Sequence, residues 1–156
     1  MEEVAEAAAY QVYINFRTVD TKNTLASLIY HSLTRCGLRV FFYQKELCTE
    51  DTVVSVVQEA ISSASVHVTI FSEHYAESRW CLQELRWIVR SSHERTILPV
   101  FFNVEPAELR QIEWGSFAEA FRNHEGSFSI EDVEGWKEAL RKAADISGFV
   151  FKTNER

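Results

Sequence analysis

Short apolar runs with strand character alternate along the chain with segments whose apolar residues recur at helical spacing. Residues 10–16 alternate between two faces and are rich in strand-favouring side chains, which predicts a first β-strand. The segment that follows keeps its apolar residues at helical spacing. We therefore expect a helix that begins at a cap, Asp20 or Thr21, and ends near Arg35, where Gly37 stops it.

The same alternation continues to the end of the chain. Strands are predicted at residues 38–43, 66–71 and 96–102, with a short fifth strand at 149–151. Helices are predicted at about 53–61, 78–91, 117–124 and 133–146, and residues 44–52 and 103–115 are expected to form loops. The run at 96–102 is apolar on both faces, as is typical of a parallel strand that is covered on both sides.

Alternating strands and helices predict the fold class: an α/β, flavodoxin-like, doubly wound parallel sheet of about five strands with helices on both faces. We expect one domain at residues 10–151, an acidic leader at 1–9 and a C-terminal tail at 152–156. Ligands of such sheets bind beyond the carboxyl ends of the strands. Residues 15–22, 44–52, 72–80 and 103–115 should therefore surround one crevice.

Composition narrows the class of protein further. The chain has 156 residues, 46% of them hydrophobic and 25% charged, which suits one globular domain. A net charge of −7 argues against binding to duplex nucleic acid. Three scattered cysteines without a CxxC pair predict neither a disulfide framework nor a zinc site. No apolar run is long enough for a membrane span, and the acidic N-terminus is unlike a signal peptide, so we expect a cytoplasmic protein.

The sequence lacks the motifs of several common enzyme and binding-site classes. A phosphoryl-accepting receiver domain shares this architecture, but it needs acidic residues where this chain has Asn15, Phe16, Arg17 and Ser72. The glycine-rich nucleotide loops and the GxSxG nucleophile turn are absent from the sequence. No HExxH string occurs and the histidines do not pair at metal-binding spacing, so no metal site is predicted.

The predicted helix at 78–91 carries the most informative carboxylate. Trp80, Glu84 and Trp87 are spaced to share one helix face, while the apolar stripe lies on another. A carboxylate between two indoles at the mouth of the crevice would be partly desolvated and would favour a cationic partner. The alternative is a solvated helix residue beside Arg79 or Arg86. Spacing alone thus predicts a site but no reaction.

Five further segments, spread over nearly the whole chain, form a recognisable set. They are residues 10–17 with 20–21, 71–85, 98–106, 115–121, and 136–140 with 147–148. The string Ser-Arg-Trp-Cys-Leu-Gln-Glu-Leu at 78–85 is the most specific part of them. In sequence and in order, these segments resemble the plant-type Toll/interleukin-1 receptor (TIR) domain family.

The resemblance implies an NAD+ hydrolase that cleaves the nicotinamide–ribose bond on self-association, in innate immune and cell-death signalling. NAD+ would be the substrate, with no tightly bound cofactor, and the partners would be copies of this chain and other TIR domains. It also implies that Glu84 is the catalytic residue. The residues implied to bind NAD+ are Phe16, Arg17, Thr18, Asp20, Thr21, Lys45, Ser72 and Trp80.

The chain departs from the family pattern at the pocket rim and on one assembly surface. The departures are Thr18 and Val19, Tyr43 and Gln44, Glu50, and Leu28, which replaces a histidine of the first helix. Threonine does not adopt the backbone conformations that glycine permits at the rim. A second hypothesis therefore remains open, in which the chain is a non-catalytic module that assembles with other TIR domains.

Overall fold

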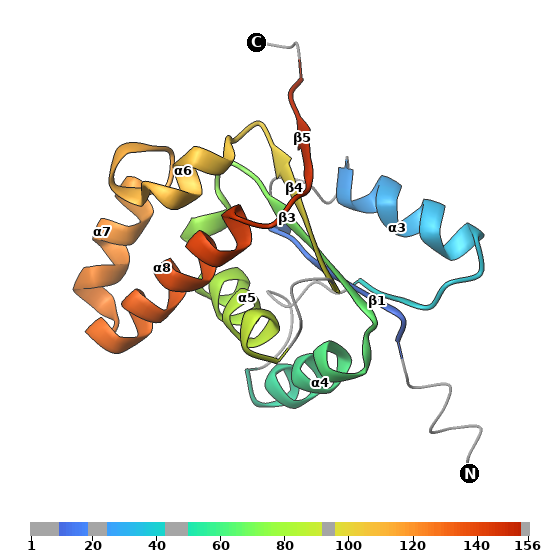
Figure 1. Cartoon of the computed structure of the whole chain (residues 1–156). Helices are drawn as coiled ribbons and strands as arrows, with labels where there is room; N and C mark the ends of the chain where they lie inside the picture. Colours follow the sequence, from blue (N-terminus) through green and yellow to red (C-terminus); the bar gives the residue numbers. More distant parts are fainter. Residues whose placement is uncertain (1–9, 19–24, 43–49, 92–95, 154–156) are drawn as a thin grey trace.

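A five-stranded parallel sheet forms the centre of the molecule (Figure 1). The structure is a computed structural model and describes residues 10–18, 25–42, 50–91 and 96–153. The strands pair in the order β2-β1-β3-β4-β5, and every pairing is parallel. Their bounds are Val12–Asn15 (β1), Val40–Phe41 (β2), Val66–Phe71 (β3), Ile97–Phe102 (β4) and Phe149–Phe151 (β5). The fold class expected from the sequence is confirmed.

Helices cover both faces of this sheet. The described helices are α3 (Leu25–Arg35), α4 (Glu50–Ser63), α5 (Arg79–Ser91), α6 (Pro106–Arg110), α7 (Ala118–Ser127) and α8 (Ile130–Ala144). Two short 3-10 helices, η2 (Tyr75–Glu77) and η4 (Ile112–Trp114), lie in the connections. Helix α3 packs on one face of the sheet, while α4 and α5 pack on the other, with α8 against α5 (Figure 1).

Side chains of strand β1 pack on both faces of the sheet, because successive side chains of a strand point in opposite directions. Val12 and Ile14 belong to the core cluster on the α3 face. Tyr13 packs in the cluster that contains residues of α4 and α5, and Asn15 contacts α5 on that same face. The alternation predicted for this strand is confirmed, and it directs the polar Asn15 toward α5.

The two strands nearest the N-terminus are shorter than expected. β1 has four residues where 10–16 were expected, and β2 has two where 38–43 were expected, with residue 43 outside the described residues. Among the described strands, β2 pairs only with β1. The chain leaves α3 through a turn at Gly37 (φ 92°), and the Leu38 N–H donates to the Leu33 carbonyl. Leu38 is therefore held by the helix end and cannot extend the edge strand.

The expected loop at 103–115 is wrong, because it contains α6 and η4. The Glu105 N–H donates to Glu108 Oε2 at 2.9 Å, within a capping box, and Pro106 occupies the first turn of α6. Both features favour a helix start. Helix α4 also begins at Glu50, earlier than the expected start at residue 53.

No helix within the described ranges has the length and apolar character needed to cross a lipid bilayer. The expected leader at 1–9 lies outside those ranges, as do residues 154–156 of the expected tail.

Gly148 allows β5 to approach β4 closely. Pro99 of β4 has no N–H to donate, and β5 pairs with β4 only from Val100 onward. Gly148 therefore lies beside Pro99, where a Cβ would overlap the Pro99 carbonyl oxygen. The last strand depends on a glycine here because a backbone atom, unlike the end of a flexible side chain, cannot move aside.

We expect Gly148→Ala to lower the free energy of unfolding by about 1–3 kcal/mol, as overpacking does. Gly126→Ala is the matched control, because Gly126 is exposed in α7 and a Cβ there meets nothing within 4 Å. This control should gain up to about 1 kcal/mol from helix propensity. Urea unfolding of both variants measures the difference, and equal stability would contradict the close approach.

Candidate active site

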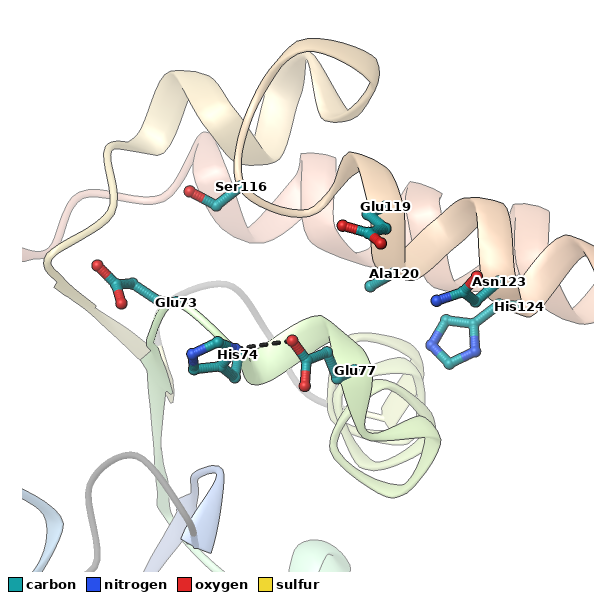
Figure 2. A pocket seen from close by; sticks show the side chains of 8 residues that line it. All are labelled: Glu73, His74, Glu77, Ser116, Glu119, Ala120, Asn123 and His124. Atoms are coloured by element: carbon teal, nitrogen blue, oxygen red, sulfur yellow. Dashed lines mark hydrogen bonds and ion pairs between the residues drawn. The ribbon is translucent and has the colours of Figure 1, made fainter.

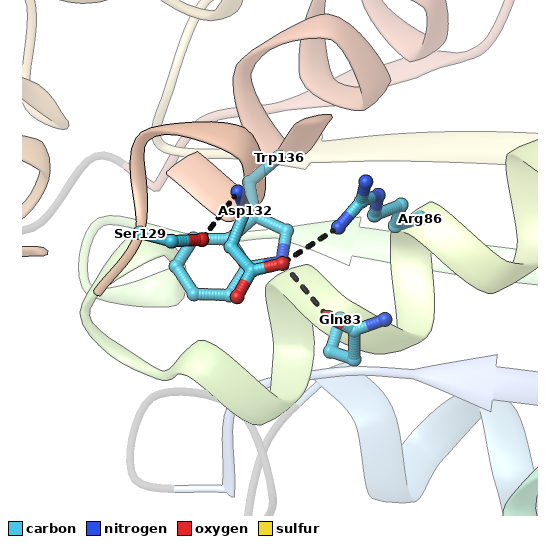
Figure 3. A network of polar contacts seen from close by, with 5 residues as sticks. All are labelled: Gln83, Arg86, Ser129, Asp132 and Trp136. Atoms are coloured by element: carbon cyan, nitrogen blue, oxygen red, sulfur yellow. Dashed lines mark hydrogen bonds and ion pairs between the residues drawn. The ribbon is translucent and has the colours of Figure 1, made fainter. Parts of the chain in front are cut away.

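Helix α5 carries the candidate carboxylate and is anchored to α8 by polar contacts (Figure 3). Arg86 donates to Asp132 Oδ1 at 3.2 Å, and Trp136 Nε1 donates to Gln83 Oε1 at 3.1 Å. Its buried residues are Cys81, Leu82, Glu84, Leu85 and Ile88. Four of these five are apolar, and the fifth is the candidate carboxylate.

Glu84 lies on the side of α5 that faces β1, and its exposed fraction is 0%. Asn15 Nδ2 donates to Glu84 Oε1 at 3.0 Å. The carboxylate was expected to be partly desolvated and is fully buried instead, and the alternative of a solvated helix residue is wrong. The physical reason is that α5 is covered by the sheet on one side and by α8 on the other, which a helical wheel does not reveal.

Four residues surround this carboxylate, and together with it they form what we call the Glu84 network: Tyr13, Asn15, Tyr75, Cys81 and Glu84. The Tyr75 hydroxyl donates to Asn15 Oδ1 and lies 3.1 Å from the Cys81 carbonyl oxygen. Asn15 Nδ2 lies 3.4 Å from the same carbonyl oxygen. These contacts join β1, η2 and α5 around one acidic group.

Both tyrosines of the network are held in the protonated form. Burial, and then the charge of Glu84, raise the pKa of the Tyr13 hydroxyl well above its usual range. Burial also raises the pKa of Tyr75, with further contributions from Cys81 and Glu84. Near neutral pH these hydroxyls are therefore uncharged donors beside the carboxylate.

Three of the residues expected to bind NAD+ follow β1 directly. Phe16 has no exposed surface, its ring stacks on Phe42 with centroids 4.8 Å apart, and its carbonyl oxygen accepts a hydrogen bond from Cys81 Sγ at 3.3 Å. Arg17 and Thr18 are half-buried at the carboxyl end of β1. The ring of Phe16 thus belongs to the core, while its two neighbours keep exposed surface.

The other expected binding residues come from two places. Ser72 follows β3 and is buried, and its carbonyl oxygen accepts the Tyr75 N–H that opens η2. Trp80 is half-buried in α5, with the Arg79 guanidinium 4.8 Å from its ring centroid. Trp87 packs instead against the cluster shared with α4, so the two indoles do not frame an open carboxylate. Asp20, Thr21 and Lys45 lie outside the described residues.

Sequence reasoning placed the segments that contain Asn15 and Tyr75 around the crevice, but it did not name these two residues or Tyr13 as members of the site. One signal was available: Asn15 is the only amide in a strand of apolar and aromatic residues, at its carboxyl end. Buried amides are nearly always hydrogen-bonded, so this residue required a polar partner from another element. The sequence did not reveal which element supplies that partner, because this depends on how α5 packs against β1.

A separate cavity of about 540 Å³ lies between the η2 segment and α7 (Figure 2). It is acidic, and His74 Nδ1 lies 2.7 Å from Glu77 Oε2 at its edge. Its lining residues are Glu73, His74, Glu77, Ser116, Glu119, Ala120, Asn123 and His124, none of which belongs to the Glu84 network. Within the described part of the chain, no group of three or more metal-binding side chains is arranged to hold an ion.

The sheet order, the helical layers and the position of Glu84 define a flavodoxin-like domain with a carboxylate near the carboxyl end of its first strand. A model of the TIR domain family matches residues 9–156. The chain therefore belongs to the TIR domain family, and the resemblance described from its motifs is confirmed.

Plant disease resistance proteins are among its relatives. TMV resistance protein N of Nicotiana glutinosa is 37% identical over 144 residues, which are 90% of this chain and 12% of that protein. The probable 2' cyclic ADP-D-ribose synthase BdTIR of Brachypodium distachyon is 34% identical over 142 residues, 91% of this chain and 59% of that protein. The chain thus spans about a tenth of the resistance protein and more than half of the second relative.

The solved TIR domains of the activated Roq1 resistosome, which directly recognises the pathogen effector XopQ, have the same fold. Their superposition gives a TM-score of 0.80 at 34% identity, and it covers 92% of this chain and 88% of that one.

The burial of Glu84 predicts that Glu84→Ala lowers the free energy of unfolding by about 1–3 kcal/mol, because it leaves the buried Asn15 amide without its acceptor. Glu84→Gln keeps an acceptor oxygen and the volume, so its change should be smaller. Exposed Glu138 in α8 supplies the control, and Glu138→Ala should stay within about 0.5 kcal/mol. Thermal melts compare the three variants. If Glu84→Ala matched Glu138→Ala, the buried hydrogen bond would be refuted.

Proposed function

We propose that this TIR domain cleaves the bond between nicotinamide and ribose in NAD+ when copies of it associate, and that it acts in plant innate immune and cell-death signalling. The observation that carries the proposal is the Glu84 carboxylate, which α5 holds beside the carboxyl end of β1. Ligands of this fold bind at that edge of the sheet.

The chemistry suits a site with one acidic group. Nicotinamide is attached to the ribose as a cation, and it leaves as a neutral molecule with the bonding electron pair, so it needs no proton from a general acid. The ribose becomes oxocarbenium-like, as in glycoside hydrolysis. A preorganised carboxylate stabilises that positive charge. Attack by water then gives hydrolysis, whereas attack by a hydroxyl of the same molecule gives a cyclic product.

Two comparisons support this proposal. One relative is named as a probable 2' cyclic ADP-D-ribose synthase, and ADP-ribose is what remains of NAD+ after nicotinamide leaves. The TIR domains of Roq1 were solved within an activated resistosome, which supports association as the active state.

The residues that we propose for NAD+ binding extend from the Glu84 network to the surface. Arg17 is suited to a phosphate group because its guanidinium offers several donors. Trp80 can stack on a flat ring. The full set proposed is Phe16, Arg17, Thr18, Asp20, Thr21, Lys45, Ser72 and Trp80. Of these, Phe16 contributes through its backbone, since its ring is buried.

We also propose that the protein works in the cytoplasm. Cys36 and Cys81 are free cysteines. Reduced thiols suit a compartment rich in glutathione.

A second candidate function, a non-catalytic TIR assembly module, is favoured by two observations. Glu84 has no exposed surface through which a substrate could reach it in this structure. Leu28, on the outer side of α3, is 63% exposed and offers an apolar contact for another copy. The two candidates differ in one measurable property, the release of nicotinamide.

We expect purified protein to release nicotinamide from NAD+, and faster at high protein concentration. Glu84→Gln should lower the turnover by about 10²–10³, the range for loss of one preorganised electrostatic group. Chromatography of the nicotinamide formed gives the rate, and the melting temperature of the same samples separates catalysis from folding. Release by the wild type no faster than in buffer alone would favour the assembly module.

Leu28→Asp should weaken self-association, because it places a charge on an exposed apolar position of α3. We expect the dissociation constant to rise by about tenfold or more, equivalent to about 1.4 kcal/mol. The matched control is Val56→Asp in α4, which is 39% exposed on the opposite side of the sheet. Light scattering across a concentration series measures both. An equal effect of the two variants would show that Leu28 has no special part in assembly.

A further inference from the structure

We propose that Asn15 is a positioning residue for Glu84, and that Tyr75 in turn fixes the orientation of the Asn15 amide. This inference deepens the proposed function and rests on it for the reaction that Glu84 performs. Its structural basis is the set of hydrogen bonds that joins η2, β1 and α5.

All three polar positions of the Asn15 amide have matching partners. The nitrogen faces two groups that can only accept, the Glu84 carboxylate at 3.0 Å and the Cys81 carbonyl oxygen at 3.4 Å. The amide oxygen faces the Tyr75 hydroxyl, which is a donor. A flipped amide would place its oxygen against two acceptors, so only one orientation satisfies the site.

The hydrogen bond determines the rotation of the carboxylate. When Glu84 Oε1 is held by Asn15 Nδ2, the plane and direction of the other oxygen are fixed by the geometry of the group. Asn15 is fully buried on β1, the strand at the middle of the β2-β1-β3 pairing, so its own position is rigid. A reacting group held on a rigid strand avoids the reorientation that would otherwise slow the chemical step.

The same contact favours the ionised carboxylate over the protonated one, because a donated hydrogen bond stabilises negative charge. Tyr13 of β1 and Tyr75 of η2 are titratable groups that interact with Glu84, and Cys81 of α5 lies near both tyrosines. Both tyrosines remain uncharged at neutral pH, and the Cys81 thiol donates to the Phe16 carbonyl. The Asn15 amide therefore supplies an uncharged donor to the carboxylate.

Asn15→Leu is the direct test, since it preserves most of the volume and removes the donor. We expect kcat for nicotinamide release to fall by about ten- to a hundredfold, by analogy with the loss of a group that orients a metal ligand. KM should change less than twofold, because Asn15 does not contact the substrate in the proposed site. Tyr75→Phe removes only the hydroxyl that holds the amide, and it should lower kcat in the same direction by a smaller factor.

Thr69→Val is the matched control. Thr69 is buried on β3 directly beside Asn15 in the strand register, and within the described ranges its hydroxyl makes no hydrogen bond. Its loss should leave kcat and KM unchanged. An equal fall of kcat in this control would mean that any change in this layer slows the reaction, and the positioning role of Asn15 would be refuted.

A second measurement is independent of activity. In protein labelled with ¹³C at glutamate side-chain carboxyls, the Glu84 resonance is identified by its disappearance in Glu84→Gln. Its titration midpoint should move to higher pH in Asn15→Leu and in Tyr75→Phe, because the ionised form loses stabilisation, and it should stay in place in Thr69→Val. If Asn15→Leu does not fold, the kcat and the Glu84 titration midpoint of Tyr75→Phe alone test the positioning role.

The outcomes separate the two proposals. Unchanged kcat and an unchanged Glu84 midpoint in the folded variants would overturn the positioning role while leaving the reaction in place. A wild type that releases no nicotinamide would overturn the reaction. In that case, a shifted Glu84 titration midpoint in the variants would still support the control of Glu84 by Asn15. An unshifted midpoint would refute both the reaction and the positioning role.

Discussion

A carboxylate in the interior of a protein must be hydrogen-bonded, because removing its charge from water without compensation is costly. In this domain Glu84 meets that constraint through Asn15 of β1, across the interface between α5 and the sheet. The contact requires α5 to lie at one rotation and one height relative to β1. The anchoring of α5 to α8 through Arg86 and Asp132 fixes that same rotation from the other side. Stability and the geometry of the candidate site therefore depend on the same helix.

One member of the Glu84 network comes from a very short element. Tyr75 comes from η2, a 3-10 helix of three residues between β3 and α5. The Ser72 carbonyl holds the start of that turn, and the Ser78 hydroxyl accepts the Cys81 N–H at 3.2 Å where α5 begins. Each step from β3 to α5 is thus closed by a local hydrogen bond. These local hydrogen bonds hold the connection in one conformation, and they thereby place the Tyr75 hydroxyl beside β1.

Much of the fold could be predicted from the sequence, because strongly apolar runs and helical spacing are local signals. The bounds of β3 and β5 are as expected, and α5 begins one residue later than expected. The ends of the edge strand β2 could not be predicted from the local sequence, because the length of this strand depends on its pairing with β1. The burial of Glu84 could not be predicted either, because it depends on two elements that cover α5 from opposite sides. Helix α6, in contrast, was readable from Glu105, Pro106 and Glu108.

Strand β1 has four residues, and alternate ones serve different purposes. Val12 and Ile14 fill the core under α3, while Asn15 reaches the carboxylate on the other face. Inserting or deleting one residue in such a strand exchanges its two faces. An amide would then enter the apolar layer beneath α3, and a neighbouring side chain would replace it beside Glu84. The number of residues in β1 is therefore constrained, independently of which amino acids it contains. Single-residue insertions in β1 should be far less tolerated than insertions in the surface connections.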